Sequence, residues 1–269
     1  MFSSPHVSSV VLFAAAVSLF CATKAVAQGG QQPLTATIMQ NNVQSDTIQW
    51  ANFPAVRTAD TASYLSPNER RMIHELNMAR LYPKEYAPFV RFYIERQRRE
   101  MDLSKGMIGT ALREVPPTIA NGQPTFVTDT FRLVDTYRRE IEAAEELIVE
   151  LNTMHAVGRL LPNSCMYSVA ALHATDDYER GYANLRSPDG TMPFDRIPHA
   201  CTELKGANEV LISNQLTARQ AAIALLVDGQ SQERVRRRIV LNPQWHFVAP
   251  FEEGPVGADE HCWILDWGY

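Results

Sequence analysis

Strand-forming segments are confined to the last third of this chain, and that placement limits the possible folds more than any other feature. Three short segments there, at 209–213, 245–251 and 261–267, are rich in β-branched and aromatic residues, as strands usually are. The apolar residues before them recur mainly at helical spacing. We therefore predict one α+β domain, in which several helices surround a small sheet.

The first helix is marked by its capping residues. Ser66 can cap a helix whose first position is Pro67, and Glu69 can complete a capping box with Ser66. Pro83 removes a backbone donor and should break this helix. We predict that a second helical segment runs from Pro83 towards residue 101.

Further helices are expected at 128–152, 164–182 and 217–228. Thr217 and Gln220 provide the last of these with a second capping pair. Each segment presents apolar residues at helical spacing and ends near a polar residue or a glycine. We expect these helices to pack against the small sheet and cover its apolar faces.

Glycine and proline mark the connections between these elements. The segment 104–123 contains five such residues, which predicts a connecting loop. The segment 253–260 is also rich in them and should turn the last two strands into a hairpin. Residues 28–62 are rich in Gln, Asn, Thr and Ala and lack apolar periodicity, so we expect a mobile leader there.

Residues 1–27 have the features of a secretory signal peptide. Residues 7–22 are apolar, and residues 25–27 (Ala-Val-Ala) have the small-x-small form of a cleavage site. No Lys or Arg precedes the apolar stretch, which leaves an uncleaved anchor as the alternative. We expect cleavage, a mature chain that begins near Gln28, and a secreted, extracellular protein.

The net charge and the distribution of apolar residues restrict the kinds of partner that can be expected. The formal net charge is −5, which gives no sign of a nucleic-acid partner. After the signal segment, no hydrophobic run is long enough to form a transmembrane segment. An extracellular ligand or protein of unknown identity is therefore the expected partner.

Three cysteines remain after the signal segment that contains Cys21. They are Cys165, Cys201 and Cys262, so an exported chain can form one disulfide and keep one thiol. Cys201 lies shortly before the 209–213 strand and Cys262 lies in the last strand, so we predict a Cys201–Cys262 disulfide and a free Cys165. The alternative is three buried thiols. No Cys-x-x-Cys pair is present to suggest a thiolate zinc site.

Four motifs follow one another in the last third of the chain. They are Ser-Pro-Asp-Gly at 187–190, Pro-Phe-Asp-Arg at 193–196, Ala-Asn-Glu-Val-Leu at 207–211 and Arg-Arg-Arg-Ile-Val-Leu-Asn-Pro at 236–243. Their order resembles the CAP superfamily of cysteine-rich secretory and pathogenesis-related proteins. Leu-Asn-Met-Ala-Arg at 76–80 resembles the first-helix signature of this family.

This resemblance implies an α-β-α sandwich, with a small central sheet between helices and a cleft at its centre. It covers about 66–100 and 160–269 and is nearest to the bacterial-type branch. On this basis the CAP-like domain spans 63–269, with an extra helical insert at about 101–159.

Many CAP proteins bind a divalent cation in that cleft with two histidines and acidic partners. In this sequence Glu209 stands at the family's glutamate position, whereas Leu185 and Arg236 stand at the two histidine positions. Asp228 falls in the acidic stretch, and His173 lies on the second helix of the resemblance. The family comparison therefore implies a degenerate cation site formed by these five residues, and we assign no metal, cofactor or catalytic residue to it.

A carboxylate at Glu209 without histidine-bound metal needs another positive partner if it is buried. We predict that the Arg236 guanidinium lies near Glu209 and takes the electrostatic place of the cation. The alternative is that Arg236 points to solvent and that backbone amides bind Glu209. The groups that contact Glu209 in the structure therefore distinguish between these two alternatives.

A search for short catalytic and metal-binding motifs reveals no catalytic site in the sequence. His74-Glu75 lacks the second histidine of a His-Glu-x-x-His metal motif, and no Gly-x-Ser-x-Gly elbow is present. His173 and Asp177 are four residues apart on a predicted helix, which favours a simple side-chain contact over a ligand pair. The arginines at 234–238 are either an anion-binding patch or a solvated run with one inward-pointing member.

The sequence favours a secreted binding or interaction module with a non-functional cation site. One alternative is an extracellular hydrolase of the kind proposed for some CAP proteins, which would need an active-site cluster that the motifs do not reveal. Another is a carrier of a lipid or other small apolar ligand, which would need an apolar groove. We lean away from an enzyme.

Overall fold

The computed structural model describes residues 50–115, 125–180, 184–253 and 262–269. The predicted signal peptide, most of the predicted leader and all but Glu253 of the predicted 253–260 turn lie outside the described residues. Gly181, expected at the end of a helix, also lies outside them.

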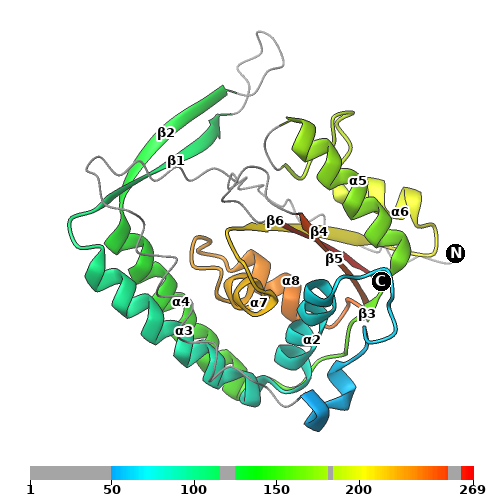
Figure 1. The fold of residues 1–269 in the computed structure, drawn as a ribbon, viewed down its shortest axis with the longest axis horizontal. Coiled ribbons are helices and arrows are strands. Elements are labelled where there is room, and N and C mark those ends of the chain that lie inside the picture. Colours follow the sequence, from blue (N-terminus) through cyan, green and yellow to red (C-terminus); the bar gives the residue numbers. More distant parts are fainter. Residues whose placement is uncertain (1–49, 116–124, 181–183, 254–261) are drawn as a thin grey trace, which may run out of the picture.

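A four-stranded sheet forms the centre of the fold (Figure 1). Its strand order is β3-β5-β6-β4, and β6 pairs antiparallel with both of its neighbours. The three strands predicted from the sequence are present, and a two-residue strand pairs parallel with β5 at one edge. The strands are β3 (Leu161–Pro162), β4 (Ala207–Ser213), β5 (Phe247–Glu253) and β6 (Cys262–Gly268).

Helices cover both faces of this sheet, so the predicted α+β class is confirmed (Figure 1). One layer contains α5 (Ser164–Arg180) and α6 (Pro193–Ala200). The opposite layer contains α2 (Pro67–Leu81), α7 (Ala218–Val227) and α8 (Val235–Leu241). Two long helices, α3 (Pro83–Leu103) and α4 (Leu133–Thr153), pack against each other beside the second layer.

The alternation of side chains along the strands divides the core into two sides. Val210 of β4, with Trp263, Leu265 and Trp267 of β6, belongs to the large core shared with α2 and α7. Ile264 of β6 points the other way and packs against α5. Glu209 and Asp266 alternate with the large-core residues, so their side chains face the α5–α6 layer.

The predicted helix starts are confirmed. The Ser66 hydroxyl accepts a hydrogen bond from the Glu69 amide at 3.2 Å, and the Glu69 carboxylate accepts one from the Ser66 amide at 2.6 Å. Thr217 and Gln220 form the same reciprocal pair before α7. The helix break at Pro83 is also present, since α2 ends at Leu81 and α3 begins at Pro83.

The prediction of a loop at 104–123 is wrong in part, because this segment contributes a strand. β1 (Ile108–Val115) pairs antiparallel with β2 (Thr125–Arg132), and α4 consequently begins at Leu133, later than predicted. Gly109 suits a strand here because the Phe131 ring lies across it: a Cβ at Gly109 would lie 2.8 Å from the ring carbons. The hairpin extends from the ends of α3 and α4 (Figure 1).

The predicted mobile leader does not extend through residues 50–62. This stretch includes two 3-10 turns, η2 (Trp50–Asn52) and η3 (Pro54–Val56), and Val56 is fully buried in the large core. The Asn77 side-chain amide of α2 donates a hydrogen bond to the Val56 carbonyl at 3.2 Å. Packing against α2 orders this stretch, although its composition lacks apolar periodicity.

Candidate functional site

Five ionisable side chains converge between the sheet and the α5–α6 layer. Four of them are buried, and the guanidinium-bearing side chain is only 11% exposed. We call this group the buried charge cluster. Its members are His173, Asp177, Arg196, Glu209 and Asp266.

Strand register explains why two carboxyl groups meet here. Glu209 of β4 lies directly opposite Asp266 of β6 in the antiparallel ladder. Directly opposed side chains project to the same face of a sheet, with Cβ atoms about 4.5–5.5 Å apart. The sheet therefore brings two acids together in a place from which water is excluded.

Arg196 supplies the positive charge that this acidic pair requires. Its guanidinium contacts the Glu209 carboxylate at 2.5 Å and donates a second hydrogen bond to the Leu185 carbonyl at 2.8 Å. A guanidinium is always charged and offers several donors in one plane. One side chain of α6 thus compensates Glu209 and fixes the loop that precedes the helix.

The prediction that Arg236 pairs with Glu209 is therefore wrong. Arg236 contacts Asp228 instead: its amide donates to one carboxylate oxygen at 2.8 Å, and its guanidinium lies 3.6 Å from the other. Asp228 caps the end of α7, in the layer on the other face of the sheet. The structure thus separates Asp228 and Arg236 from Glu209.

One further residue of the predicted site, His173, lies beside Glu209, whereas Leu185 contacts Arg196 through its backbone carbonyl. His173 Nε2 is 2.6 Å from the Asn184 carbonyl, 3.5 Å from Glu209 and 3.7 Å from Asp177. A carbonyl oxygen can only accept a hydrogen bond, so Nε2 carries a proton and donates a hydrogen bond to the Asn184 carbonyl. The His173–Asp177 contact has the predicted i,i+4 spacing, and this histidine serves as a donor.

Burial raises the pKa of both facing carboxyl groups. The charge of Glu209 raises the pKa of Asp266 further, while Arg196 opposes the increase at both acids. Two like charges at this separation disfavour joint ionisation. Because Arg196 contacts Glu209 directly, we assign the negative charge to Glu209 and the proton to Asp266.

Two cluster residues were missed by the sequence prediction. Arg196 belongs to the Pro-Phe-Asp-Arg motif, which was recognised only as part of a pattern. Asp266 is the single acid in a strand whose residues are all buried. An acid between Leu265 and Trp267 in an apolar strand is a signal of a buried polar contact, and it could have indicated Asp266.

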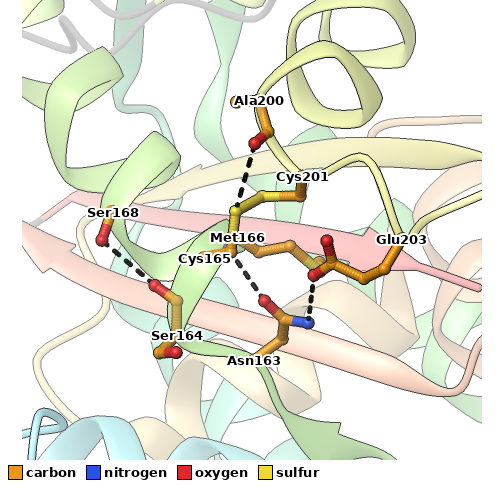
Figure 2. Close-up of a disulfide and its surroundings, with 8 residues drawn as sticks. All are labelled: Asn163, Ser164, Cys165, Met166, Ser168, Ala200, Cys201 and Glu203. Atoms are coloured by element: carbon orange, nitrogen blue, oxygen red, sulfur yellow. Dashed lines mark hydrogen bonds between the residues drawn. A yellow bond between two sulfur atoms is a disulfide. The ribbon is translucent and has the colours of Figure 1, made fainter.

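A disulfide links the start of α5 to the end of α6 (Figure 2). It joins Cys165 to Cys201, with Cα atoms 5.9 Å apart, so the predicted Cys201–Cys262 pairing is wrong. Cys201 packs with Leu204 near the Gly268 end of β6. Cys262 begins that strand, six residues away, or about 20 Å along it, and it is buried without a disulfide.

This disulfide also borders a helix cap. The Asn163 side chain accepts a hydrogen bond from the Met166 amide at 2.9 Å, as an N-cap residue does, and Figure 2 shows its amide directed at Glu203. The covalent link holds α5, which carries His173, against α6, which carries Arg196. The disulfide therefore supports the geometry of the buried charge cluster.

Replacing Cys165 and Cys201 together with alanine should lower the free energy of unfolding by about 2–4 kcal/mol, because the bond closes a long loop in the unfolded chain. Urea unfolding of the double variant, with Cys262→Ala as the control for cysteine loss, measures this effect. Peptide mapping without reductant should recover a linked Cys165–Cys201 peptide. A linked Cys201–Cys262 peptide would contradict the assignment.

The arginines at 234–238 contact acidic side chains and backbone carbonyls of the same chain. Arg237 is the inward-pointing member and donates to the Leu226, Ala143 and Val227 carbonyls. Its three neighbours form ion pairs with Glu146, Asp228 and Glu233. The solvated-run interpretation fits these contacts better than an anion-binding patch.

Within the described residues, one group of three side chains has the spacing of metal ligands: Cys165, Cys201 and Glu203. Both sulfur atoms of that group are bonded to each other, so neither is a thiolate ligand. In the same described portion, no helix combines the length and the apolarity needed to cross a membrane.

No family model and no curated protein matches the chain. Two solved structures resemble parts of it. An outer surface protein from Borrelia burgdorferi matches with 18% identity and a TM-score of 0.36, over 48% of this chain and 90% of that one. An extracellular SCP-domain protein from Bacillus anthracis matches with 14% identity and a TM-score of 0.33, over 60% of this chain and 64% of that one. At these values neither likeness supports an inference, and the chain's family stays a proposal.

Proposed function

We propose that this protein is an exported binding module of CAP type, in which an internal guanidinium occupies the electrostatic place of a cation. The contact between Arg196 and Glu209 carries this proposal. Glu209 stands where the motif order places the acidic ligand of the family, and Arg196 already compensates its charge. The Cys165–Cys201 disulfide supports export, because disulfides persist mainly in oxidising compartments.

The residues around Glu209 do not suit a divalent cation held by two histidines. Leu185 offers only a backbone carbonyl, which already accepts from Arg196. His173 uses Nε2 as a donor to Asn184. A cation would therefore have to displace the Arg196 guanidinium and rearrange the histidine, so we derive no chemistry through a metal.

Partner recognition is favoured over catalysis for a similar reason. Acids with a raised pKa do occur in active sites, but structural ion networks raise the pKa of acids as well. Asp266 is fully buried, and its partner Glu209 is 3% exposed. A substrate could reach neither carboxyl group without a rearrangement of α5 or α6, whereas a binding module requires no such access.

Calorimetric titration with zinc tests this proposal. The wild-type protein should show no site with a Kd below about 1 μM. Arg196→Gln, checked for folding by circular dichroism, should acquire measurable zinc binding, because the Glu209 carboxylate then lacks its cationic partner. Glu209→Gln in the same background should abolish that gain. Submicromolar zinc binding by the wild type that is lost in Glu209→Gln would overturn the proposal.

A further inference from the structure

Three donor atoms of the kind that zinc binds meet where the disulfide joins α5 to α6 (Figure 2). They belong to Cys165 at the start of α5, Cys201 at the end of α6, and Glu203 two residues further along the chain. The two sulfur atoms and a carboxylate oxygen lie within 4.8 Å of one another. The disulfide occupies both sulfurs, so the group can bind a metal ion only after reduction.

The local backbone holds the Glu203 carboxylate beside the sulfurs. The Leu204 amide donates a hydrogen bond to the Cys201 carbonyl at 3.0 Å, which closes a turn that contains Glu203. Leu204 and Cys201 are buried in the same apolar cluster, which anchors this turn. The Asn163 side-chain amide lies 3.5 Å from the Glu203 carboxylate and donates to it. These contacts reduce the ordering that an ion would otherwise have to impose.

The start of α5 favours the thiolate form of Cys165. Asn163 caps this 17-residue helix by accepting a hydrogen bond from the Met166 amide, so Cys165 lies in its first turn. The positive end of a helix stabilises a thiolate. Cys165 is partly exposed, whereas Cys201 is fully buried. A reductant therefore reaches the disulfide at the Cys165 sulfur.

A small dithiol supplies the two electrons that reduction needs. One thiolate of the dithiol attacks the Cys165 sulfur, and the sulfur–sulfur bond breaks with its electron pair on Cys201. The second thiolate attacks the dithiol's own bound sulfur, releases Cys165 and leaves a cyclic disulfide. A metal ion then replaces any proton that either cysteine sulfur has taken up, and that proton passes to water.

The reduced group suits zinc in both geometry and charge. Zinc holds sulfur at about 2.3 Å, so rotation of two side chains whose Cα atoms are 5.9 Å apart lets both sulfurs reach one ion. Two thiolates and the Glu203 carboxylate repel one another until a divalent cation lies between them. Thiolate ligands select zinc over magnesium or calcium, which prefer oxygen alone. Glu203 is exposed, so water can fill the fourth tetrahedral position.

We propose that Cys165, Cys201 and Glu203 form a redox-gated zinc site. In the oxidised protein the two sulfurs form the disulfide that joins α5 to α6, and zinc is excluded. In the reduced protein the same sulfurs and the neighbouring carboxylate bind the ion, which then joins the two helices in place of the disulfide. The site shares no residue with the buried charge cluster, and it goes beyond the binding function proposed above.

Calorimetric titration with zinc tests this inference on the mature chain carrying Cys262→Ala, so that only the paired cysteines supply thiols. The reductant is a water-soluble phosphine, because dithiols bind zinc themselves. The oxidised protein should show no site with a Kd below about 1 μM. The reduced protein should bind one zinc ion at least about tenfold more tightly than this limit. Cobalt in place of zinc should give a thiolate-to-cobalt charge-transfer absorption.

Two variants locate the ligands in the reduced protein. Glu203→Gln should weaken zinc binding at least about tenfold through the loss of the carboxylate, and Cys201→Ser at least about a hundredfold through the loss of a thiolate. Glu233→Gln removes an exposed acid that lies beside α8. It is the matched control and should leave the Kd unchanged.

Three results would overturn the inference. The first is the absence of submicromolar zinc binding after reduction. The second is unfolding of the reduced protein in the presence of zinc, measured by circular dichroism, because the three ligands meet only in the folded chain. The third is equal zinc affinity in Glu203→Gln and its parent. If Glu209→Gln abolished the binding instead, the ion would lie in the buried charge cluster, and the proposed function would fail as well.

Discussion

Replacing Arg196 with alanine is expected to destabilise the protein by about 3–5 kcal/mol, because removal of one partner leaves a buried charge uncompensated. Glu209 is the stranded group: its side chain is fully buried, and Arg196 is its close cationic partner. The free energy of unfolding in urea, followed by circular dichroism at neutral pH, measures the loss. A double variant, Arg196→Met with Glu209→Gln, should recover much of it, because neither partner then carries a charge.

The matched control is Arg236→Ala. The Arg236 side chain is 26% exposed and lies 3.6 Å from Asp228, so its loss should cost less than about 1 kcal/mol, as for partly exposed ion pairs. Equal losses for Arg196→Ala and Arg236→Ala would count against the central role given to Arg196. The control is informative because the sequence motifs had placed Arg236, rather than Arg196, beside Glu209.

The pH dependence supplies a second readout of the same variant. Burial raises the pKa of Glu209 in the folded protein, and loss of Arg196 removes an interaction that lowers it. A raised folded-state pKa means that the penalty is absent below the unfolded pKa and grows as the pH rises towards the folded pKa. The destabilisation by Arg196→Ala should therefore be smallest near pH 4, which is about the ordinary pKa of a glutamate carboxyl group. It should increase as the pH rises towards neutral.

Local patterns predicted the parts of the fold that local forces decide. The capping boxes at Ser66 and Thr217 depend on residues three positions apart, and both are present. The late strands were visible from their β-rich composition, and the strand position of Glu209 fixed the face to which it points. These features need no knowledge of distant contacts.

Partners that meet through tertiary packing were not predictable in the same way. Motif alignment offered Arg236 as a substitute for a histidine, but α8 lies in the layer on the far side of the sheet. Cys201 and Cys262 both lie near strands, yet Cys201 follows α6 and packs near the Gly268 end of β6, whereas Cys262 begins that strand. The choice of partner depended on layer and register, which sequence spacing alone does not encode.

A second large effect is expected at Arg80, which joins three segments of the chain. It is fully buried, and its guanidinium donates to the carbonyls of Gly158, Val240, Asn242 and Trp245 at 2.6–3.3 Å. Burial lowers its pKa to about 10, so it remains charged at neutral pH. The side chain ties α2 to the segment before β3 and to the connection between α8 and β5.

Arg80→Met should therefore lower the free energy of unfolding by at least about 4 kcal/mol, since each of the four orphaned carbonyls costs about 1 kcal/mol or more. Arg80→Lys should recover only part of the loss, because one ammonium cannot span acceptors placed around a planar fork. Arg98→Ala is the control: its ion pair with Glu145 is exposed and should contribute less than about 1 kcal/mol. Urea unfolding of the three variants decides the matter. Full stability of Arg80→Lys would show that the charge, and not the shape of the guanidinium, holds these segments together.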